Sequence, residues 1–177
     1  MEEKQLVLGV LSDNHGESYP QVLEELADCD AILHAGDVGN IQILQDLAKL
    51  GSPLYVATGN NDLNVVRKVS LEFKLITFEE INLRVLMTHD PGAYNAMVLQ
   101  DPPQNIQQKI DEFKPHIFVF GHWHKRFAET VNGIFCFNPG GITKRYTRDG
   151  HPGFSKLYVK KSAHNGSFEF EPKYFDL

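Results

Sequence analysis

Short apolar runs alternate with amphipathic stretches along the first part of the chain. Three runs of strand length are Leu6–Leu11, Ala31–Leu33 and Leu54–Thr58. Between them, apolar residues recur at helical spacing, first at Val22, Leu23 and Leu26 and then at Ile41, Leu44, Leu47 and Ala48. Strand and helix in alternation predict a parallel βαβ core.

The ends of these two helices carry local signals. Ser18 precedes the first helix as a candidate N-cap, and Pro20 stands in its first turn, where a backbone N–H is not needed. Gly51 follows the second helix, and glycine readily adopts the left-handed conformation that ends a helix. We therefore expect the first helix to begin after Ser18 and the second to end before Gly51.

The pattern changes in the second half to closely spaced, β-rich runs. Leu71–Phe78 and Leu83–Thr88 flank Asn82 and predict an antiparallel hairpin. One more helix is predicted from Ile106, Ile110 and Phe113, ended by Lys114 and Pro115. A second hairpin is predicted where Phe127–Val131 and Ile134–Phe137 flank Asn132 and Gly133. Further strands are expected at Ile117–Phe120, Phe154–Val159 and Phe168–Phe170. The overall prediction is an α/β fold in which two sheets pack together.

The composition fits one folded domain over residues 1–177. Of the 177 residues 42% are apolar, which is enough for a hydrophobic core. No apolar run approaches the roughly 20 residues of a membrane-spanning helix, and residues 1–4 have no signal-peptide character. The two cysteines, Cys29 and Cys136, make no disulfide framework. We expect a cytoplasmic protein with no membrane partner.

Charged residues are distributed unevenly. The net charge is -6, yet residues 1–50 carry ten acidic and two basic side chains, whereas residues 121–161 carry eight basic and two acidic ones. The acidic total disfavours a nucleic acid polymer as partner. In the basic segment, Lys144, Arg145 and Arg148 either form a solvated surface or attract anionic substrates, and the sequence leaves both interpretations open.

Side chains able to bind a metal ion follow five of the predicted strands. In an α/β sheet the ligand crevice lies outside the carboxyl ends of the strands, so these five loops are expected to converge. The candidate ligands are Asp13, His15, Asp37, Asn60, His89, His122 and His124. Imidazoles, carboxylates and one amide are too many donors for a single tetrahedral ion, but they suit two divalent ions. We expect Mn²⁺ first, with Ni²⁺, Fe²⁺, Zn²⁺ and Co²⁺ as alternatives.

The order and spacing of these motifs resemble the calcineurin-like metallophosphoesterase superfamily, and more narrowly its small YfcE-type phosphodiesterases. The matching motifs are Asp-x-His at 13–15, Gly-Asp at 36–37, Gly-Asn-x-Asp at 59–62, His89, Gly-His-x-His at 121–124 and Asn-Pro-Gly at 138–140. The resemblance implies a four-layer α/β/β/α sandwich of two mixed sheets, with the metal site at its edge.

The resemblance also implies how the ligands divide between two metal ions. Asp13, His15, Asp37 and His124 would hold the first ion, and Asp37, Asn60, His89 and His122 the second, with Asp37 bridging. It implies a phosphoesterase that hydrolyses phosphodiesters by attack of a metal-bridging hydroxide on phosphorus. The expected partner is a small phosphoester substrate.

Two positions depart from the pattern of many relatives. Asn61 stands where a histidine protonates the leaving group. An amide cannot act as a general acid, so we expect Asn61 to contribute to catalysis only by donating a hydrogen bond to a phosphate oxygen. We expect Asn60 and Asn61 together to bind the substrate. Trp123 stands where a small residue is common. Its indole either packs beneath the loop, the favoured interpretation, or binds the substrate by stacking on it.

Two rival functions stay open on the same fold. One is a non-catalytic protein-interaction scaffold such as the retromer subunit Vps29, which the loss of the general acid at Asn61 favours. The other is a nuclease with the same two-metal chemistry, which the acidic chain disfavours.

His34 is interpreted as a core histidine that has a hydrogen-bond partner. The sequence leaves the formation of homo-oligomers open.

Overall fold

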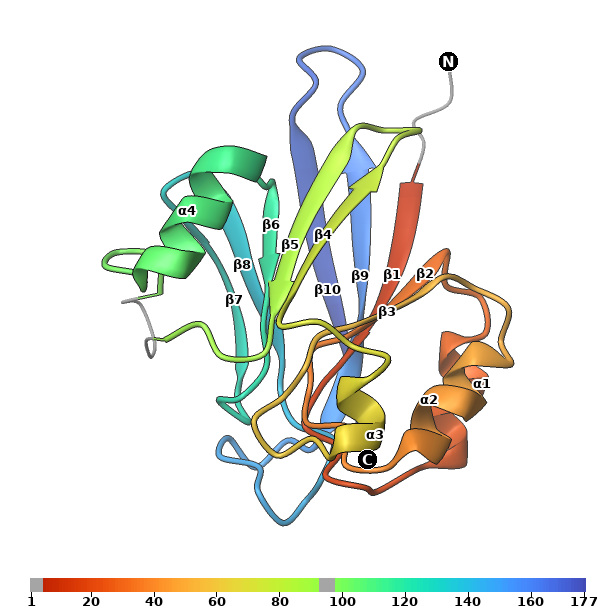
Figure 1. Ribbon diagram of the computed structural model, residues 1–177. Helices are drawn as coiled ribbons and strands as arrows, with labels where there is room; N and C mark the ends of the chain where they lie inside the picture. The colour runs from red at the N-terminus through yellow and green to blue at the C-terminus, as the bar shows by residue number, and fades with distance from the viewer. Residues whose placement is uncertain (1–4, 93–97) are drawn as a thin grey trace.

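The structure, a computed structural model, describes residues 5–92 and 98–177. These residues form two five-stranded sheets with helices outside them (Figure 1). The elements in chain order are β1 (Gln5–Leu11), α1 (Pro20–Leu26), β2 (Ala31–His34), α2 (Ile41–Ala48), β3 (Leu54–Val56), α3 (Asn64–Arg67), β4 (Phe73–Phe78), β5 (Leu83–Thr88), α4 (Gln104–Phe113), β6 (Ile117–Val119), β7 (Arg126–Val131), β8 (Ile134–Pro139), β9 (Gly153–Lys161) and β10 (Phe168–Asp176).

The first sheet has the strand order β10-β9-β1-β2-β3. Strands β1, β2 and β3 are parallel, with Leu8 opposite Ala31 and Ile32 opposite Leu54. Strand β9 pairs antiparallel with β1, and β10 pairs antiparallel with β9. The predicted parallel βαβ core is therefore confirmed, and the two late strands extend it on one side.

The second sheet has the strand order β4-β5-β6-β8-β7. Strands β5, β6 and β8 are parallel, whereas β4 and β7 pair antiparallel with β5 and β8. The two predicted hairpins, β4-β5 and β7-β8, are both confirmed. Each sheet thus mixes parallel and antiparallel pairs, as expected.

The central strands of both sheets are buried on both faces, which explains why they are largely apolar at consecutive positions. In β1, Leu8 and Val10 lie in the core between the sheets, while Leu11 belongs to the cluster that includes Leu26 and Leu47 of the helices. In β6, Val119 faces the core between the sheets and Phe118 packs in a third cluster that includes Ile106 of α4. Alternate residues of a strand therefore point to opposite layers.

Figure 1 shows α1 and α2 on one side of the pair of sheets and α4 on the other. Three apolar clusters separate four layers, one between the sheets and one beneath each helical layer. The four-layer α/β/β/α sandwich is therefore confirmed. No described helix is long and apolar enough to cross a membrane.

Some local predictions were wrong. The N-cap of α1 is Tyr19 rather than Ser18, and its side chain makes no capping hydrogen bond. The single turn of α3 was not predicted, because four residues are too few to show helical periodicity. Strand β10 continues to Asp176 through Pro172, beyond the predicted end at Phe170. Proline is tolerated there because β10 is an edge strand.

Candidate metal centre

Five loops that carry predicted ligands meet at one end of the sandwich. They follow the carboxyl ends of β1, β2 and β3 in the first sheet and of β5 and β6 in the second. Parallel strands within each sheet bring their carboxyl ends to the same edge. The packing of the two sheets then places the two edges side by side, as the distances between ligand atoms show.

Asp13, His15 and His124 form the first group of potential ligands. The Nε2 atom of His124 lies 3.2 Å from Oδ1 of Asp13 and 3.3 Å from Nε2 of His15. Two of these side chains come from the loop after β1, and the third comes from the loop after β6. The first group therefore joins the two sheets.

Asn60, His89 and His122 form the second group. The Oδ1 atom of Asn60 lies 3.0 Å from Nε2 of His89 and 3.0 Å from Nδ1 of His122. His89 is almost completely buried, whereas Asn60 is exposed. The amide oxygen of Asn60 is thus the point at which the two imidazoles converge.

Asp37 lies between the two groups. Its Oδ2 atom is 3.4 Å from Nε2 of His89 and 3.7 Å from Nε2 of His15. Asp13 is also close to the second group, because its Oδ1 lies 3.9 Å from Nε2 of His89. All seven predicted ligands are therefore brought together, with both carboxylates near the middle.

The donors at this centre fit divalent cations. Oδ1 of Asp13 is buried and accepts no hydrogen bond from any described residue, although its other oxygen accepts one from Ser12 at 2.6 Å. A buried carboxylate oxygen without a donor carries a large free-energy cost, which a cation removes. The set of imidazole nitrogens with carboxylate and amide oxygens suits Mn²⁺, Fe²⁺, Ni²⁺ or Zn²⁺.

Burial and charge shift the pKa values of these groups in different directions. Burial raises the pKa of Asp13 to about 7. Burial also acts to raise the pKa of Asp37, but the hydrogen bond and charge of His89 and the hydrogen bonds of Asn61 hold it well below its usual range. Burial acts to lower the pKa of His89, yet Asp37 and Asp13 together raise it to about 9. The centre therefore holds an ionised pair beside a carboxyl group whose charge is costly without a cation.

Five of the seven predicted ligands have a left-handed backbone conformation. The φ angles are 58° at Asp13, 48° at His15, 54° at Asp37, 66° at His122 and 53° at His124. For non-glycine residues this region costs roughly 1–2 kcal/mol each, and such strain is concentrated at functional sites. Loop-to-loop hydrogen bonds hold the conformation, among them one from the backbone N–H of His15 to the carbonyl of Asp37 at 2.9 Å.

The sequence profile of the calcineurin-like phosphoesterase superfamily domain matches residues 6–162 of this chain. The chain belongs to this superfamily.

The individual proteins that are similar to this chain share only a minority of its residues. A probable metallophosphoesterase of Methanocaldococcus jannaschii is 26% identical over 147 residues, which cover 78% of this chain and 69% of the relative. A phosphodiesterase of the same organism is 20% identical over 75% of this chain and 82% of the relative. The structure of Vacuolar Protein Sorting 29 from Cryptosporidium parvum is similar with a TM-score of 0.67 at 19% identity, over 98% of this chain and 99% of that one. At that identity the likeness shows the fold alone.

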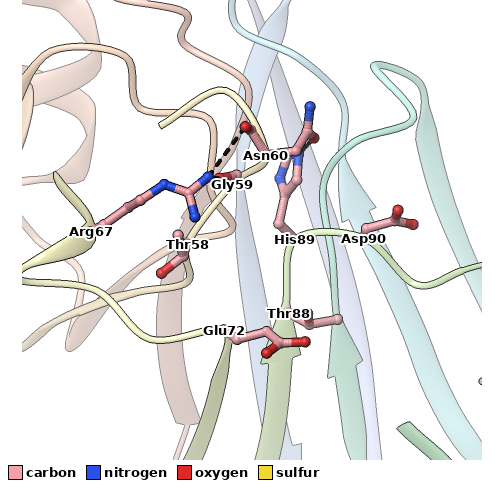
Figure 2. A pocket seen from close by; sticks show the side chains of 8 residues that line it. All are labelled: Thr58, Gly59, Asn60, Arg67, Glu72, Thr88, His89 and Asp90. Carbon is pink, nitrogen blue, oxygen red and sulfur yellow. Dashed lines mark hydrogen bonds between the residues drawn. The ribbon is translucent and has the colours of Figure 1, made fainter. Parts of the chain in front are cut away.

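Two residues that support the centre of this phosphoesterase-superfamily domain were not predicted to do so. The guanidinium of Arg67 donates to the backbone carbonyl of Asp62 at 2.8 Å. It also donates to the backbone carbonyls of Gly59 at 3.2 Å and Asn60 at 3.3 Å (Figure 2). The carboxylate of Asp62 accepts the backbone N–H groups of Gly39 at 3.1 Å and Gly59 at 2.7 Å. Their partners are backbone atoms, which carry no signal in the sequence.

Gly59 is the point of closest approach between the ligand loops. A Cβ atom at this position would lie 2.0 Å from the backbone nitrogen of Asp37 and 2.1 Å from its Oδ1. Any side chain would therefore push the loop that carries Asn60 away from Asp37. The glycine before Asn60 in the motif is therefore a packing requirement of the candidate metal centre.

Asn61 contacts the central carboxylate. Its backbone N–H donates to Oδ1 of Asp37 at 2.8 Å, and its side-chain amide donates to Oδ2 at 2.7 Å. The residue is exposed, and it also lines a cavity beside the centre. Its predicted contact with a substrate phosphate stays a prediction.

Trp123 does not fit the substrate-binding role that the sequence left open. Its side chain is 2% exposed and packs edge-on against Phe120 and Phe127, with ring centroids 4.7 and 5.3 Å away. No face of the indole is available for a substrate to stack on. The favoured interpretation is confirmed and the substrate-stacking alternative is wrong: Trp123 anchors the loop between His122 and His124 in the apolar layer beneath it.

His34 is a core histidine, as expected. It is fully buried, its Nε2 lies 3.0 Å from Oδ1 of Asn14, and its Nδ1 accepts the backbone N–H of Gly36 at 3.2 Å. Burial lowers its pKa to about 4, so the ring is neutral at pH 7. His34 orients Asn14, which stands between Asp13 and His15 in the chain.

Two cavities open on the centre of the phosphoesterase domain. One, of about 520 Å³, is lined by Asn60 and His89 from the second ligand group. The other, of about 480 Å³, is lined by His15 and His124 from the first group and by Asn61. Each ligand group therefore faces a cavity of its own.

Proposed function

We propose that this chain is a phosphoesterase that depends on two divalent metal ions and hydrolyses phosphodiesters. Water adds to phosphorus and one phosphorus–oxygen ester bond breaks, which gives a phosphomonoester and an alcohol. The observation that carries the proposal is the position of Asp37, whose Oδ2 lies within 4 Å of Nε2 of both His15 and His89. A carboxylate between two sets of nitrogen ligands is what a two-metal site requires.

The residues would divide as the family resemblance implies. Asp13, His15, Asp37 and His124 would hold one ion, and Asp37, Asn60, His89 and His122 the other. When bound, such ions supply a nucleophile from water near neutral pH and offset the negative charge of the phosphoester. We propose Mn²⁺ as the metal, with Ni²⁺, Fe²⁺, Zn²⁺ and Co²⁺ as alternatives.

The side chains of the protein have separate tasks in this proposal. Asn61 donates its amide hydrogens to a phosphate oxygen and so orients the substrate, as the exposed donor nearest to Asp37. It does not protonate the leaving group, because an amide is not an acid in this pH range. Esters whose leaving groups need no protonation are therefore the better substrates.

Two observations support diesters over monoesters. A phosphodiester has two ester arms, and the centre has a cavity on each side that can take one of them. A relative with a matching sequence is named a phosphodiesterase. A monoester would use only one cavity.

The test combines metal content with hydrolysis. Purified protein is analysed for metals, stripped with a chelator and reloaded with Mn²⁺, Ni²⁺, Zn²⁺ or Mg²⁺. Hydrolysis of bis(4-nitrophenyl) phosphate and 4-nitrophenyl phosphate is then compared. We expect activity that is lost on chelation and restored by Mn²⁺, with the diester preferred.

The matched variants are Asp37→Ala and Asp111→Ala. Asp37 lies at the centre, whereas Asp111 is an exposed residue of α4 on the opposite side of the second sheet from the first sheet. Asp37→Ala should abolish both metal binding and hydrolysis, and Asp111→Ala should change neither. Full hydrolysis by Asp37→Ala would contradict the proposal.

A second candidate function is a non-catalytic scaffold. It is favoured by Asn61, which removes a general acid, and by the likeness in fold to Vacuolar Protein Sorting 29. The complete set of seven ligand-type side chains favours the enzyme instead. Protein that binds no metal and hydrolyses no ester under any of these conditions would support the scaffold.

A further inference from the structure

The two cavities beside the centre differ in charge. The cavity on the side of His15 and His124 is also lined by Arg145, Tyr146 and Arg148, and none of the described residues that line it carries a carboxylate. We call it the basic cavity. The cavity on the side of Asn60 and His89 is also lined by Arg67, Glu72 and Asp90. We call it the acidic cavity, because two carboxylates and one guanidinium line it.

The segment that carries the basic side chains is fixed to the ligand loops. The hydroxyl of Thr143 donates to Oε1 of Glu17 at 2.9 Å, and the hydroxyl of Thr147 donates to the carbonyl of Thr143 at 2.8 Å. The backbone N–H of Arg148 donates to the carbonyl of His124 at 2.9 Å. The segment is thus held at both ends beside the first ligand group.

Tyr146 extends this contact to the ligands themselves. Its ring meets the imidazole of His15 edge-on at 4.7 Å between centroids, and the guanidinium of Arg145 lies 5.3 Å above its ring. Glu17 is the nearby carboxylate, and it already accepts hydrogen bonds from Tyr19 and Thr143. These hydrogen bonds lower the pKa of Glu17 and Arg145 lowers it further, so part of the charge of Arg145 is offset. Arg145 and Arg148 together nevertheless keep the lining of the basic cavity positive.

Arg67 does not make the other cavity basic. All the hydrogen bonds that its guanidinium makes to the described residues go to backbone carbonyls of the loop 59–62. Figure 2 shows Arg67 on one side of this cavity and Asp90 on the other, with His89 and Asn60 between them. Glu72 and Asp90 are both exposed carboxylates. The guanidinium keeps its positive charge, but two carboxylates outnumber it, so the charged side chains that line this cavity carry a net negative charge.

We propose that the two cavities select an asymmetric phosphodiester. One ester arm carries a second anionic group, a carboxylate or a phosphate, and lies in the basic cavity near Arg145 and Arg148. The other arm is neutral or cationic, with hydroxyl or amino groups, and lies in the acidic cavity near Glu72 and Asp90. The inference rests on the proposed function and adds the substrate class and the direction in which the diester binds.

The physical reason is the sign of the charges on each side of the centre. Guanidinium groups bind carboxylates and phosphates through charge-assisted hydrogen bonds. Two carboxylates repel a second anion and attract an ammonium or hydroxyl group. The reverse orientation would place like charges together on both sides, so one orientation is strongly favoured.

Three 4-nitrophenyl diesters with different second arms test this proposal on the protein loaded with Mn²⁺. The second arm is 3-carboxyphenyl in the first, phenyl in the second and choline in the third. We expect kcat/KM for the carboxyphenyl diester to exceed that for the phenyl diester by about tenfold, as for one charge-assisted contact. The choline diester should also exceed the phenyl diester, by a smaller factor. Equal values for all three would overturn the inference.

Charge-neutralising variants locate the effect. Arg145→Gln and Arg148→Gln should each lower the carboxyphenyl-to-phenyl ratio of kcat/KM by roughly threefold or more. Lys160→Gln is the matched control, because Lys160 pairs with Gln5 at the start of β1, the end of the strand far from Asp13. Glu72→Gln and Asp90→Asn should lower the choline-to-phenyl ratio instead. A control that lowers the first ratio as much as Arg145→Gln would overturn the inference.

A binding measurement separates this inference from the proposed function. Benzylphosphonate and 3-carboxybenzylphosphonate have carbon–phosphorus bonds and mimic the two kinds of arm without being hydrolysed. By calorimetry the carboxylated compound should bind about tenfold more tightly, and Arg145→Gln should remove the difference. If the diesters are hydrolysed but both phosphonates bind equally, the inference alone fails. If no diester is hydrolysed with any metal, the proposed function fails and the substrate class fails with it.

Discussion

Asp13 and His124 are far apart in the chain, yet Oδ1 of Asp13 lies 3.2 Å from Nε2 of His124. Asp13 follows β1 of the first sheet and His124 follows β6 of the second. A cation bound by both residues would therefore link the two sheets. Metal binding should stabilise the packing of the sheets as well as supply the chemistry.

We expect the metal to raise the free energy of unfolding through this link. At a concentration 100 times its Kd, Mn²⁺ should add about 2.7 kcal/mol, because it binds the folded state and not the unfolded one. Asp13→Asn should lose most of this gain, since it removes one of the two carboxylate charges that attract the cation. Denaturant unfolding with and without metal measures both, and Asp111→Asn is the control. A full metal-induced gain in Asp13→Asn would refute the link.

The left-handed backbone at His15 predicts a difference between two substitutions. His15→Asn and His15→Val both remove the imidazole and its 3.3 Å contact with His124, so this loss is common to them. Asparagine tolerates the φ of 48° at this position, whereas a β-branched residue does not. Metal-free His15→Val should be less stable than His15→Asn by about 1–2 kcal/mol. Equal stabilities in urea unfolding would show that the backbone relaxes freely.

Asn61 predicts a dependence on the leaving group. Asn61→His should raise kcat/KM for a diester with a poor leaving group, such as phenol, by about tenfold, while changing little for 4-nitrophenol. This gain is smaller than general acid catalysis usually provides. The reason is that the carboxylate of Asp62 already accepts hydrogen bonds from Gly39 and Gly59 and will not orient the new imidazole. Asn61→Gln is the control without an acidic proton. A gain of the same size for both leaving groups would speak against proton donation.

His34 predicts a loss of stability in mild acid. Burial lowers its pKa from 6.5 to about 4, so between these values the unfolded chain binds a proton that the folded protein does not. The free energy of unfolding therefore falls as the pH falls through this window, by up to about 3 kcal/mol from this group. His34→Gln should make the free energy of unfolding fall less steeply with pH. The control is His164→Gln, which replaces an exposed histidine and should leave this pH dependence unchanged. Urea unfolding from pH 7.5 to 4 tests this, and parallel curves for His34→Gln and wild type would contradict it.

Trp123 predicts an effect on stability without one on substrate preference. Trp123→Phe should lower the free energy of unfolding by about 1–2 kcal/mol, because the indole packs against Phe120 and Phe127. The ratio of kcat/KM between an aryl and an alkyl diester should stay the same, since no substrate stacks on a buried ring. Phe127→Leu is the control for a general loss of packing. A fall in the aryl preference that is confined to Trp123→Phe would restore the stacking role.

The pattern of apolar runs was sufficient to predict most of the fold. Runs such as Leu6–Leu11 are apolar at consecutive positions because β1 is buried on both faces, and the hairpins follow from local turn residues such as Asn132 and Gly133. The helix α3 and the true N-cap of α1 were missed because each depends on a few residues whose conformation is fixed by contacts elsewhere in the fold. Local patterns predict elements that are long enough to repeat, and fail on shorter ones.

The sequence by itself determined which side chains stand after the strands, and therefore which donors are available to a metal. It did so because buried strands must be apolar and the polar residues that follow them are conspicuous. Only the tertiary structure decided how these donors meet. The distance between Asp13 and His124, the left-handed backbone at His15, the burial of Trp123 and the opposite charges of the two cavities all depend on how one sheet packs against the other. Contacts between loops of different sheets have no fixed spacing in the chain, so no pattern along the sequence encodes them.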